Sequence, residues 1–169
     1  LKDPELYLNR ELAQLEFNFR VLSQAQDPAV PLLERLRFLC ISNSNLDEFF
    51  EVQVAILRHH FAFGDALPGP DGMLPGDLLT RIRNRALELV RTQYAFWNDT
   101  LLPELTSEGI RFVSRAIWTR KQTRWLHGYF RTEVLPFVSP RRLNPANPFT
   151  LLRQTSLPLL CSLYSTHSS

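Results

Sequence analysis

Residues 8–22 read LNRELAQLEFNFRVL, and their apolar side chains recur at alternating steps of four and three residues. Such steps return to the same side of an α-helix, so this segment predicts one amphipathic helix. Asn9 stands where the N-cap is expected, and Asp27 should end the helix because a residue followed by proline disfavours helical dihedrals. The expected apolar stripe consists of Leu8, Leu12, Leu15, Phe19 and Leu22.

Two further helices are predicted on either side of a polar run at residues 42–44. Pro31 suits the first position of a helix, where its missing N–H costs nothing. The run Ser-Asn-Ser at 42–44 then interrupts the apolar pattern, and a third helix should start there and reach about Phe61. We expect Ser44 or Asn45 as its N-cap. The buried face of the second helix should be Leu32, Leu33, Leu36, Leu39 and Cys40.

A glycine- and proline-rich loop at residues 64–76 separates these helices from a fourth one. This helix should run from Asp77 to about Leu102 and stop at Pro103. Residues 1–103 therefore predict a mainly α fold with an amino-terminal, four-helix bundle-like domain. The stripe expected on the fourth helix is Leu78, Ile82, Leu89, Gln93 or Tyr94, Trp97 and Leu101.

The chain changes character after residue 103. Residues 109–114 alternate in polarity as a short strand does, and residues 119–135 have the apolar spacing of a helix. A single strand cannot form a sheet, so residues 104–169 predict an incomplete α/β segment, the truncated start of a second domain. The tail at 151–169 has no clear period and is expected to be divergent or disordered.

Composition and charge narrow the classes of protein. Of the 169 residues 44% are hydrophobic, which is enough for a core, and the two cysteines cannot form a disulfide framework. No membrane-spanning segment or signal peptide is found, so a cytoplasmic location is expected. Residues 1–103 carry a net charge of −4 and residues 104–169 one of +6. The basic part suits a polyanionic partner, although a solvated basic face explains it equally well.

Several residues invite a chemical interpretation, but each has a plainer one. Asp47 and Glu48 point about 100° apart on a helix, so they should complement the helix dipole rather than share a metal ion. His59 and His60 should interact with a helix C-terminus. Loops that bind phosphate through Gly-Lys-Ser/Thr, dinucleotide-binding glycine motifs, zinc-ligand spacings and nucleophile elbows are all lacking, which removes the commoner enzyme classes.

Three segments together resemble the polyphosphate kinase family, of the type that works through a phosphohistidine. They are residues 6–22 (LYLNRELAQLEFNFRVL), 31–39 (PLLERLRFL) and 44–50 (SNLDEFF), and the distances between them also agree. The resemblance is clear over residues 6–60 and extends to about residue 138. It departs from the family at Ala13 and Gln14, where a Ser-Trp pair is usual, and the tail at 151–169 does not share it.

The resemblance implies an enzyme that reversibly transfers the terminal phosphate of ATP to inorganic polyphosphate. Its catalytic histidines and Mg²⁺ ligands belong to carboxy-terminal domains, so neither catalytic residues nor metal ligands are expected within residues 1–169, and the chain alone should be inactive. The family also implies ATP, ADP and polyphosphate as ligands, a homo-oligomer, and peripheral association with the inner face of the membrane. A nucleic-acid partner is not expected, because no motif of interleaved aromatic and basic residues supports one.

The family's asparagine that contacts the nucleotide corresponds to Asn45. An amide offers both a donor and an acceptor to a base edge, and a helix N-terminus would add outward-facing N–H groups. The plainer interpretation is that Asn45 only caps a helix. Two hypotheses therefore stand: Asn45 lends a contact to an ATP site, or the chain is a non-catalytic interaction and oligomerisation module without ligand contact.

Overall fold

The computed structural model describes residues 3–64 and 67–138. Contacts divide the chain into two compact units, residues 1–112 and 113–169. The described residues are mainly helical and include no strand, so the predicted mainly α fold is confirmed. The domain limits predicted at residues 103 and 104 stay a prediction. The predictions for residues 151–169 lie outside the described residues.

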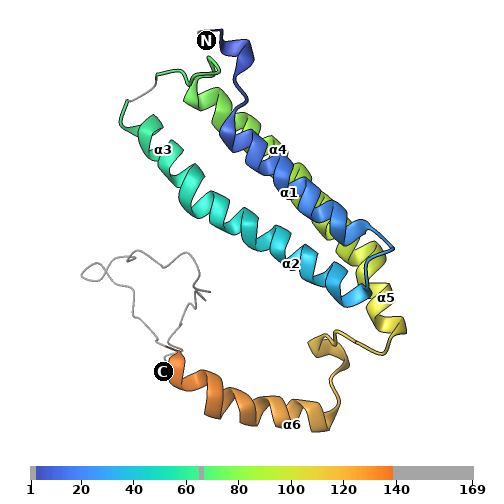
Figure 1. Cartoon of the computed structure of the whole chain (residues 1–169). Helices are drawn as coiled ribbons and strands as arrows, with labels where there is room; N and C mark the ends of the chain where they lie inside the picture. Colours follow the sequence, from blue (N-terminus) through green and yellow to red (C-terminus); the bar gives the residue numbers. More distant parts are fainter. Residues whose placement is uncertain (1–2, 65–66, 139–169) are drawn as a thin grey trace, which may run out of the picture. The chain divides into compact units, whose positions relative to one another are not determined.

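Three long helical runs form the first unit, after a short 3-10 turn η1 (Pro4–Leu6). The first run is α1 (Arg10–Gln26). The second consists of α2 (Leu32–Glu48), η2 (Phe49–Val54) and α3 (Ala55–Ala62), and the third of α4 (Pro75–Phe96), η3 (Trp97–Leu101) and α5 (Leu102–Ser107). Helix α1 packs against both α2 and α4, and Figure 1 shows these three helices running alongside one another.

Helix α1 forms as the sequence predicts. The side chain of Asn9 accepts a hydrogen bond of 2.9 Å from the backbone N–H of Leu12, which is N-cap geometry. The Asn9 amide also donates to Asp71 at 2.8 Å, and this hydrogen bond lowers the pKa of the Asp71 carboxyl. The helix ends at Gln26, before Asp27. Leu8 lies before the N-cap and is 91% exposed, so the prediction that it belongs to the apolar stripe of α1 was wrong.

The predicted break at residues 42–44 does not exist. Helix α2 passes through these residues to Glu48 and continues into the π-helical turn η2. The prediction was wrong because it treated polar residues as a chain break. Ser42 is instead fully buried and its oxygens accept hydrogen bonds from α1 and α4, so a polar residue occupies an interhelical position. Asn45 consequently lies within a helix and is not an N-cap.

The fourth helix also runs further than predicted, because Pro103 does not stop it. Between α4 and α5 the turn η3 is π-helical, with the N–H of Leu102 bonded to the carbonyl of Trp97. Proline lacks an N–H and its ring clashes with the carbonyl four residues earlier in an α-helix, whereas a wider turn relieves that clash. The run therefore continues to Ser107.

The core of the first unit lies between α1, α2–η2 and α4–η3. Gln93 rather than Tyr94 belongs to the buried stripe of α4, since Tyr94 is 65% exposed. On α2 the predicted face was partly wrong: Leu33 and Cys40 are exposed, while Arg35 is buried. The buried apolar residues that form one cluster are Leu15, Leu22, Ala25, Leu46, Phe49, Val54, Leu78, Ile82, Ala86, Leu89, Phe96 and Leu101.

The second unit is described from Val113 to Val138. It contains η4 (Arg115–Ile117), α6 (Arg120–Tyr129), η5 (Phe130–Val134) and η6 (Leu135–Phe137). Thr119 and Gln122 form a capping box at the start of α6, which confirms the predicted helix. The strand predicted at 109–114 was wrong: these residues are neither strand nor helix, because no neighbouring strand in the described chain supplies the hydrogen bonds that a strand needs.

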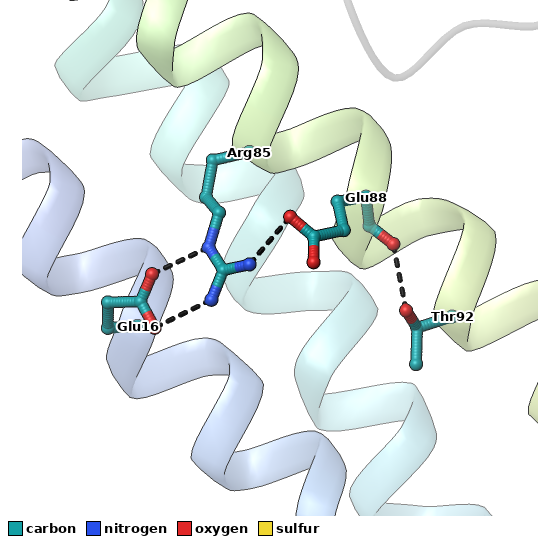
Figure 2. A network of polar contacts seen from close by, with 4 residues as sticks. All are labelled: Glu16, Arg85, Glu88 and Thr92. Carbon is teal, nitrogen blue, oxygen red and sulfur yellow. Dashed lines mark hydrogen bonds and ion pairs between the residues drawn. The ribbon is translucent and has the colours of Figure 1, made fainter.

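An ion-pair network joins α1 to α4 at the surface of the first unit (Figure 2). Two nitrogens of Arg85 contact the two carboxylate oxygens of Glu16 at 2.6 and 2.8 Å, and a third contacts Glu88 at 2.6 Å. The guanidinium also lies 3.8 Å from the centroid of the Phe19 ring. Hydrogen bonding to Arg85 lowers the pKa of Glu16, and the two carboxylates raise that of Arg85.

Glu16→Gln should lower the free energy of unfolding by about 0.5–1 kcal/mol at neutral pH, as expected for a bidentate but partly exposed ion pair. Because the pKa of Glu16 is lowered by folding, its stabilising effect is present above its ordinary pKa of 4.5 and is lost as the pH falls through the folded-state value. Urea titrations at neutral pH and at about pH 3 measure this difference. A difference that does not shrink in acid would contradict the assignment. Glu108→Gln serves as a control, since Glu108 is exposed and forms no ion pair with the described residues.

Candidate functional site

A line of buried amides and one hydroxyl crosses the core from α4 to α1. Gln93 is 5% exposed and donates from Nε2 to the hydroxyl of Ser42 at 2.9 Å. Asn18 is 3% exposed and donates from Nδ2 to the backbone carbonyl of Ser42 at 2.8 Å. Three polar residues from α1, α2 and α4 thus satisfy one another inside an otherwise apolar core, as buried polar groups must.

Asn45 stands at the outer end of this line. Its side chain is half-buried, and its Nδ2 lies 3.5 Å from Oδ1 of Asn18, the long limit of a hydrogen bond. No donor from the described residues reaches its Oδ1. Asn45 therefore keeps an unused acceptor at the boundary between core and solvent.

A small cavity of about 120 Å³ opens beside Asn45, between α1 and the junction of α2 with η2. Asn18 lies at its wall next to Asn45, and Phe17 contributes a ring that is 51% exposed. The Glu48 carboxylate is the one charged group in the wall. The lining residues are Gln14, Leu15, Phe17, Asn18, Asn45, Glu48 and Phe49.

The shape and charge of this cavity restrict what it can hold. Pockets for whole small molecules measure about 300–1,000 Å³, so this one has room for part of a ligand only. The Glu48 carboxylate would repel a phosphate group, whereas amides and an aromatic face suit a planar, uncharged ring. The lining of the cavity thus suits part of an uncharged ring better than a triphosphate.

Resemblance to the family named Asn45 as a site residue, and of the physical arguments added to it the helix N-terminus is wrong. The residue lies inside a continuous helix, so no unpaired backbone N–H groups of a helix N-terminus surround it. What the structure brings to it instead is Asn18 from α1. Sequence reasoning missed Asn18, although its position between Leu15 and Leu22 on the buried stripe of α1 was a usable signal.

The other candidate residues do not form a second site. His59 and His60 lie in the last turn of α3, as predicted, and the His59 ring packs on Phe63 at 4.4 Å. They border an open depression of about 510 Å³ whose lining residues all come from one helical run, so it is a surface and not an enclosed site. Asp47 accepts a hydrogen bond of 3.3 Å from Asn43, an exposed local contact.

Metal ligands and membrane spans are likewise missing from the part of the chain that the structure describes. Within residues 3–64 and 67–138, no three His, Cys, Asp or Glu side chains gather as a metal site requires. Over the same ranges no helix combines the length and apolar character needed to cross a bilayer.

Comparison with known proteins assigns the family. The model of the polyphosphate kinase N-terminal domain matches residues 7–113. A polyphosphate kinase from Xylella fastidiosa (strain Temecula1) is 52% identical over 162 residues, which cover 96% of this chain and 23% of that protein. One from Pseudomonas aeruginosa (strain PAO1) is 47% identical over 163 residues, covering 96% and 24%.

A solved structure agrees with this assignment. The crystal structure of the polyphosphate kinase from Porphyromonas gingivalis matches with a TM-score of 0.69 and 29% identity, over 88% of this chain and 21% of that one. The chain thus spans about a quarter of the length of the relatives it matches. It belongs to the polyphosphate kinase family, and residues 7–113 correspond to the amino-terminal domain.

Proposed function

We propose that this chain is the amino-terminal part of an enzyme that reversibly transfers the terminal phosphate of ATP to inorganic polyphosphate, and that Asn45 contacts the nucleotide base. Family membership supports the reaction. The observation that carries the role of Asn45 is its unused acceptor Oδ1 beside a cavity that suits a ring. The residues that bind the phosphates and Mg²⁺, and the histidine that carries the phosphate, would then belong to the rest of the enzyme.

The size of the cavity agrees with such a division. An enclosed site for the whole nucleotide would need several times its volume of about 120 Å³. The amino-terminal domain would therefore supply one corner of a site that other domains complete, and it would be inactive alone. ADP and polyphosphate would bind to the complete enzyme. The complete enzyme would also form the homo-oligomer.

Asn45→Ala should raise the KM for ATP about tenfold, the effect of one lost hydrogen bond, and leave kcat nearly unchanged. A base contact far from the transferred phosphate is equally strong in the ground state and the transition state, so its loss affects binding and not the chemical step. The assay would use an enzyme made by joining this chain to the remaining part, about three quarters, of the 52% identical Xylella fastidiosa relative. Polyphosphate formation at varied ATP gives both constants.

Asn43→Ala is the matched control, because Asn43 lies on the same helix, is exposed and, within the described part of the chain, has a side chain that hydrogen-bonds to Asp47 alone. It should leave KM unchanged. An unaltered KM in Asn45→Ala would refute the nucleotide contact and leave the domain as an interaction module. A joined enzyme that neither binds ATP nor makes polyphosphate would count against the proposed function as a whole.

A further inference from the structure

The amide of Asn18 can have only one orientation. Its neighbour, the backbone carbonyl of Ser42, accepts hydrogen bonds and cannot donate them, so the Asn18 group 2.8 Å away must be the NH₂. The Asn18 oxygen is therefore turned the other way, toward Asn45. Because Asn18 is 3% exposed, water cannot readily take over either contact.

The orientation of Asn18 favours one orientation of the Asn45 amide. The Asn45 group 3.5 Å from the Asn18 oxygen is the NH₂, which makes a long hydrogen bond there, whereas the opposite orientation would place two carbonyl oxygens opposite each other. The Asn45 carbonyl oxygen is then the part of the amide left for a ligand. An amide that could in principle offer a donor or an acceptor thus offers an acceptor.

The rest of the polar line holds this arrangement in place. Ser42 accepts from Asn18 with its carbonyl and from Gln93 with its hydroxyl, so α1, α2 and α4 all constrain it. None of the buried side-chain nitrogens and oxygens in the described residues lacks a partner, so a rearrangement of this line would have to break hydrogen bonds that are already made.

We propose that Asn18 is a positioning residue that fixes the Asn45 amide with its oxygen available to the base, which makes the site selective for a purine with an amino group at ring position 6. Adenine presents an exocyclic NH₂ donor, whereas hypoxanthine and guanine carry a carbonyl oxygen at the same ring position. That oxygen would face the Asn45 oxygen with no proton between them. This inference rests on the proposed nucleotide contact and adds the residue that determines its selectivity.

The test compares ATP with inosine triphosphate, which differs by having a carbonyl in place of the amino group. In the joined enzyme the KM for ATP should be about tenfold below that for inosine triphosphate, because the analogue both loses a hydrogen bond and sets its carbonyl oxygen against that of Asn45. Asn18→Leu, of similar size but without hydrogen-bonding groups, frees the Asn45 amide to turn. The ratio of the two KM values should then fall to about twofold or less.

Each result decides one question. Equal KM values in the unsubstituted enzyme would overturn the inferred orientation. An Asn18→Leu enzyme in which both KM values rise in parallel, with the ratio preserved, would show that Asn18 is only structural and overturn its positioning role. Asn18→Ala provides the same comparison if the leucine variant does not fold. Failure of the proposed nucleotide contact is distinct, because it appears as an unchanged KM for ATP in Asn45→Ala, and failure of the proposed function as a whole appears as a joined enzyme that makes no polyphosphate.

Discussion

Phe49→Ala should lower the free energy of unfolding by about 3–5 kcal/mol, the range for removing a fully buried aromatic side chain. Phe49 is 1% exposed and is among the largest fully buried side chains of the first unit. Its ring belongs to the core cluster that joins α1, η2 and α4, so truncation leaves a cavity that three helical runs would have to fill together. Urea denaturation followed by circular dichroism measures the loss.

The neighbouring residue provides a matched control. Phe50 is 39% exposed, and its ring meets that of Phe49 edge to face at 5.7 Å. Both alanine variants lose this ring contact, so the difference between them measures burial alone. Phe50→Ala should cost less than about 1.5 kcal/mol. Equal losses in the two variants would contradict the greater burial of Phe49 in the core.

Arg35→Ala should lower the free energy of unfolding by about 2–4 kcal/mol, although Arg35 is not part of the buried face that the sequence predicts for its helix. The side chain is 7% exposed and joins three elements. Its Nε donates to the carbonyl of Ala25 at 2.9 Å, its Nη1 contacts Glu104 at 2.5 Å, and its guanidinium lies 5.4 Å from the centroid of the Phe96 ring. Alanine leaves the Ala25 carbonyl without that partner and opens space beside Phe96.

Two further variants separate the causes of the stability loss expected in Arg35→Ala. Arg37→Ala removes an arginine whose side chain is 71% exposed and whose contact with Glu34 is 3.5 Å long, and it should cost about 0.5 kcal/mol or less. Arg35→Met retains an apolar stem against Phe96 while losing every hydrogen bond, so its cost should be intermediate. If Arg35→Ala costs no more than Arg37→Ala, the buried contacts of Arg35 contribute nothing net.

The family and the helical class were predictable from the sequence because both depend on local patterns. The stripe of α1, its Asn9 cap and its end before Asp27 follow from spacing and dihedral preferences within a few residues. The capping box at Thr119 is equally local. Asn45 was found by resemblance alone, and its contact with a nucleotide remains a proposal.

The interruptions predicted at residues 42–44 and at Pro103 failed for a shared reason. In each case the sequence shows a residue that a free helix would avoid, but not the feature that accommodates it. At Ser42 that feature is a set of partners on two other helices, and at Pro103 it is a wider helical turn.

The amino-acid sequence by itself determined where helices form and which broad face of each is apolar, because these depend on residues three or four positions apart. Only the tertiary structure decided what the polar residues on those faces do. Asn18, Ser42 and Gln93 lie on apolar stripes and hydrogen-bond to one another. Ser42 is 24 residues from Asn18 and 51 residues from Gln93 in the chain. A hydrogen bond over that distance exists only once the helices have packed, and so does the orientation it gives to Asn45.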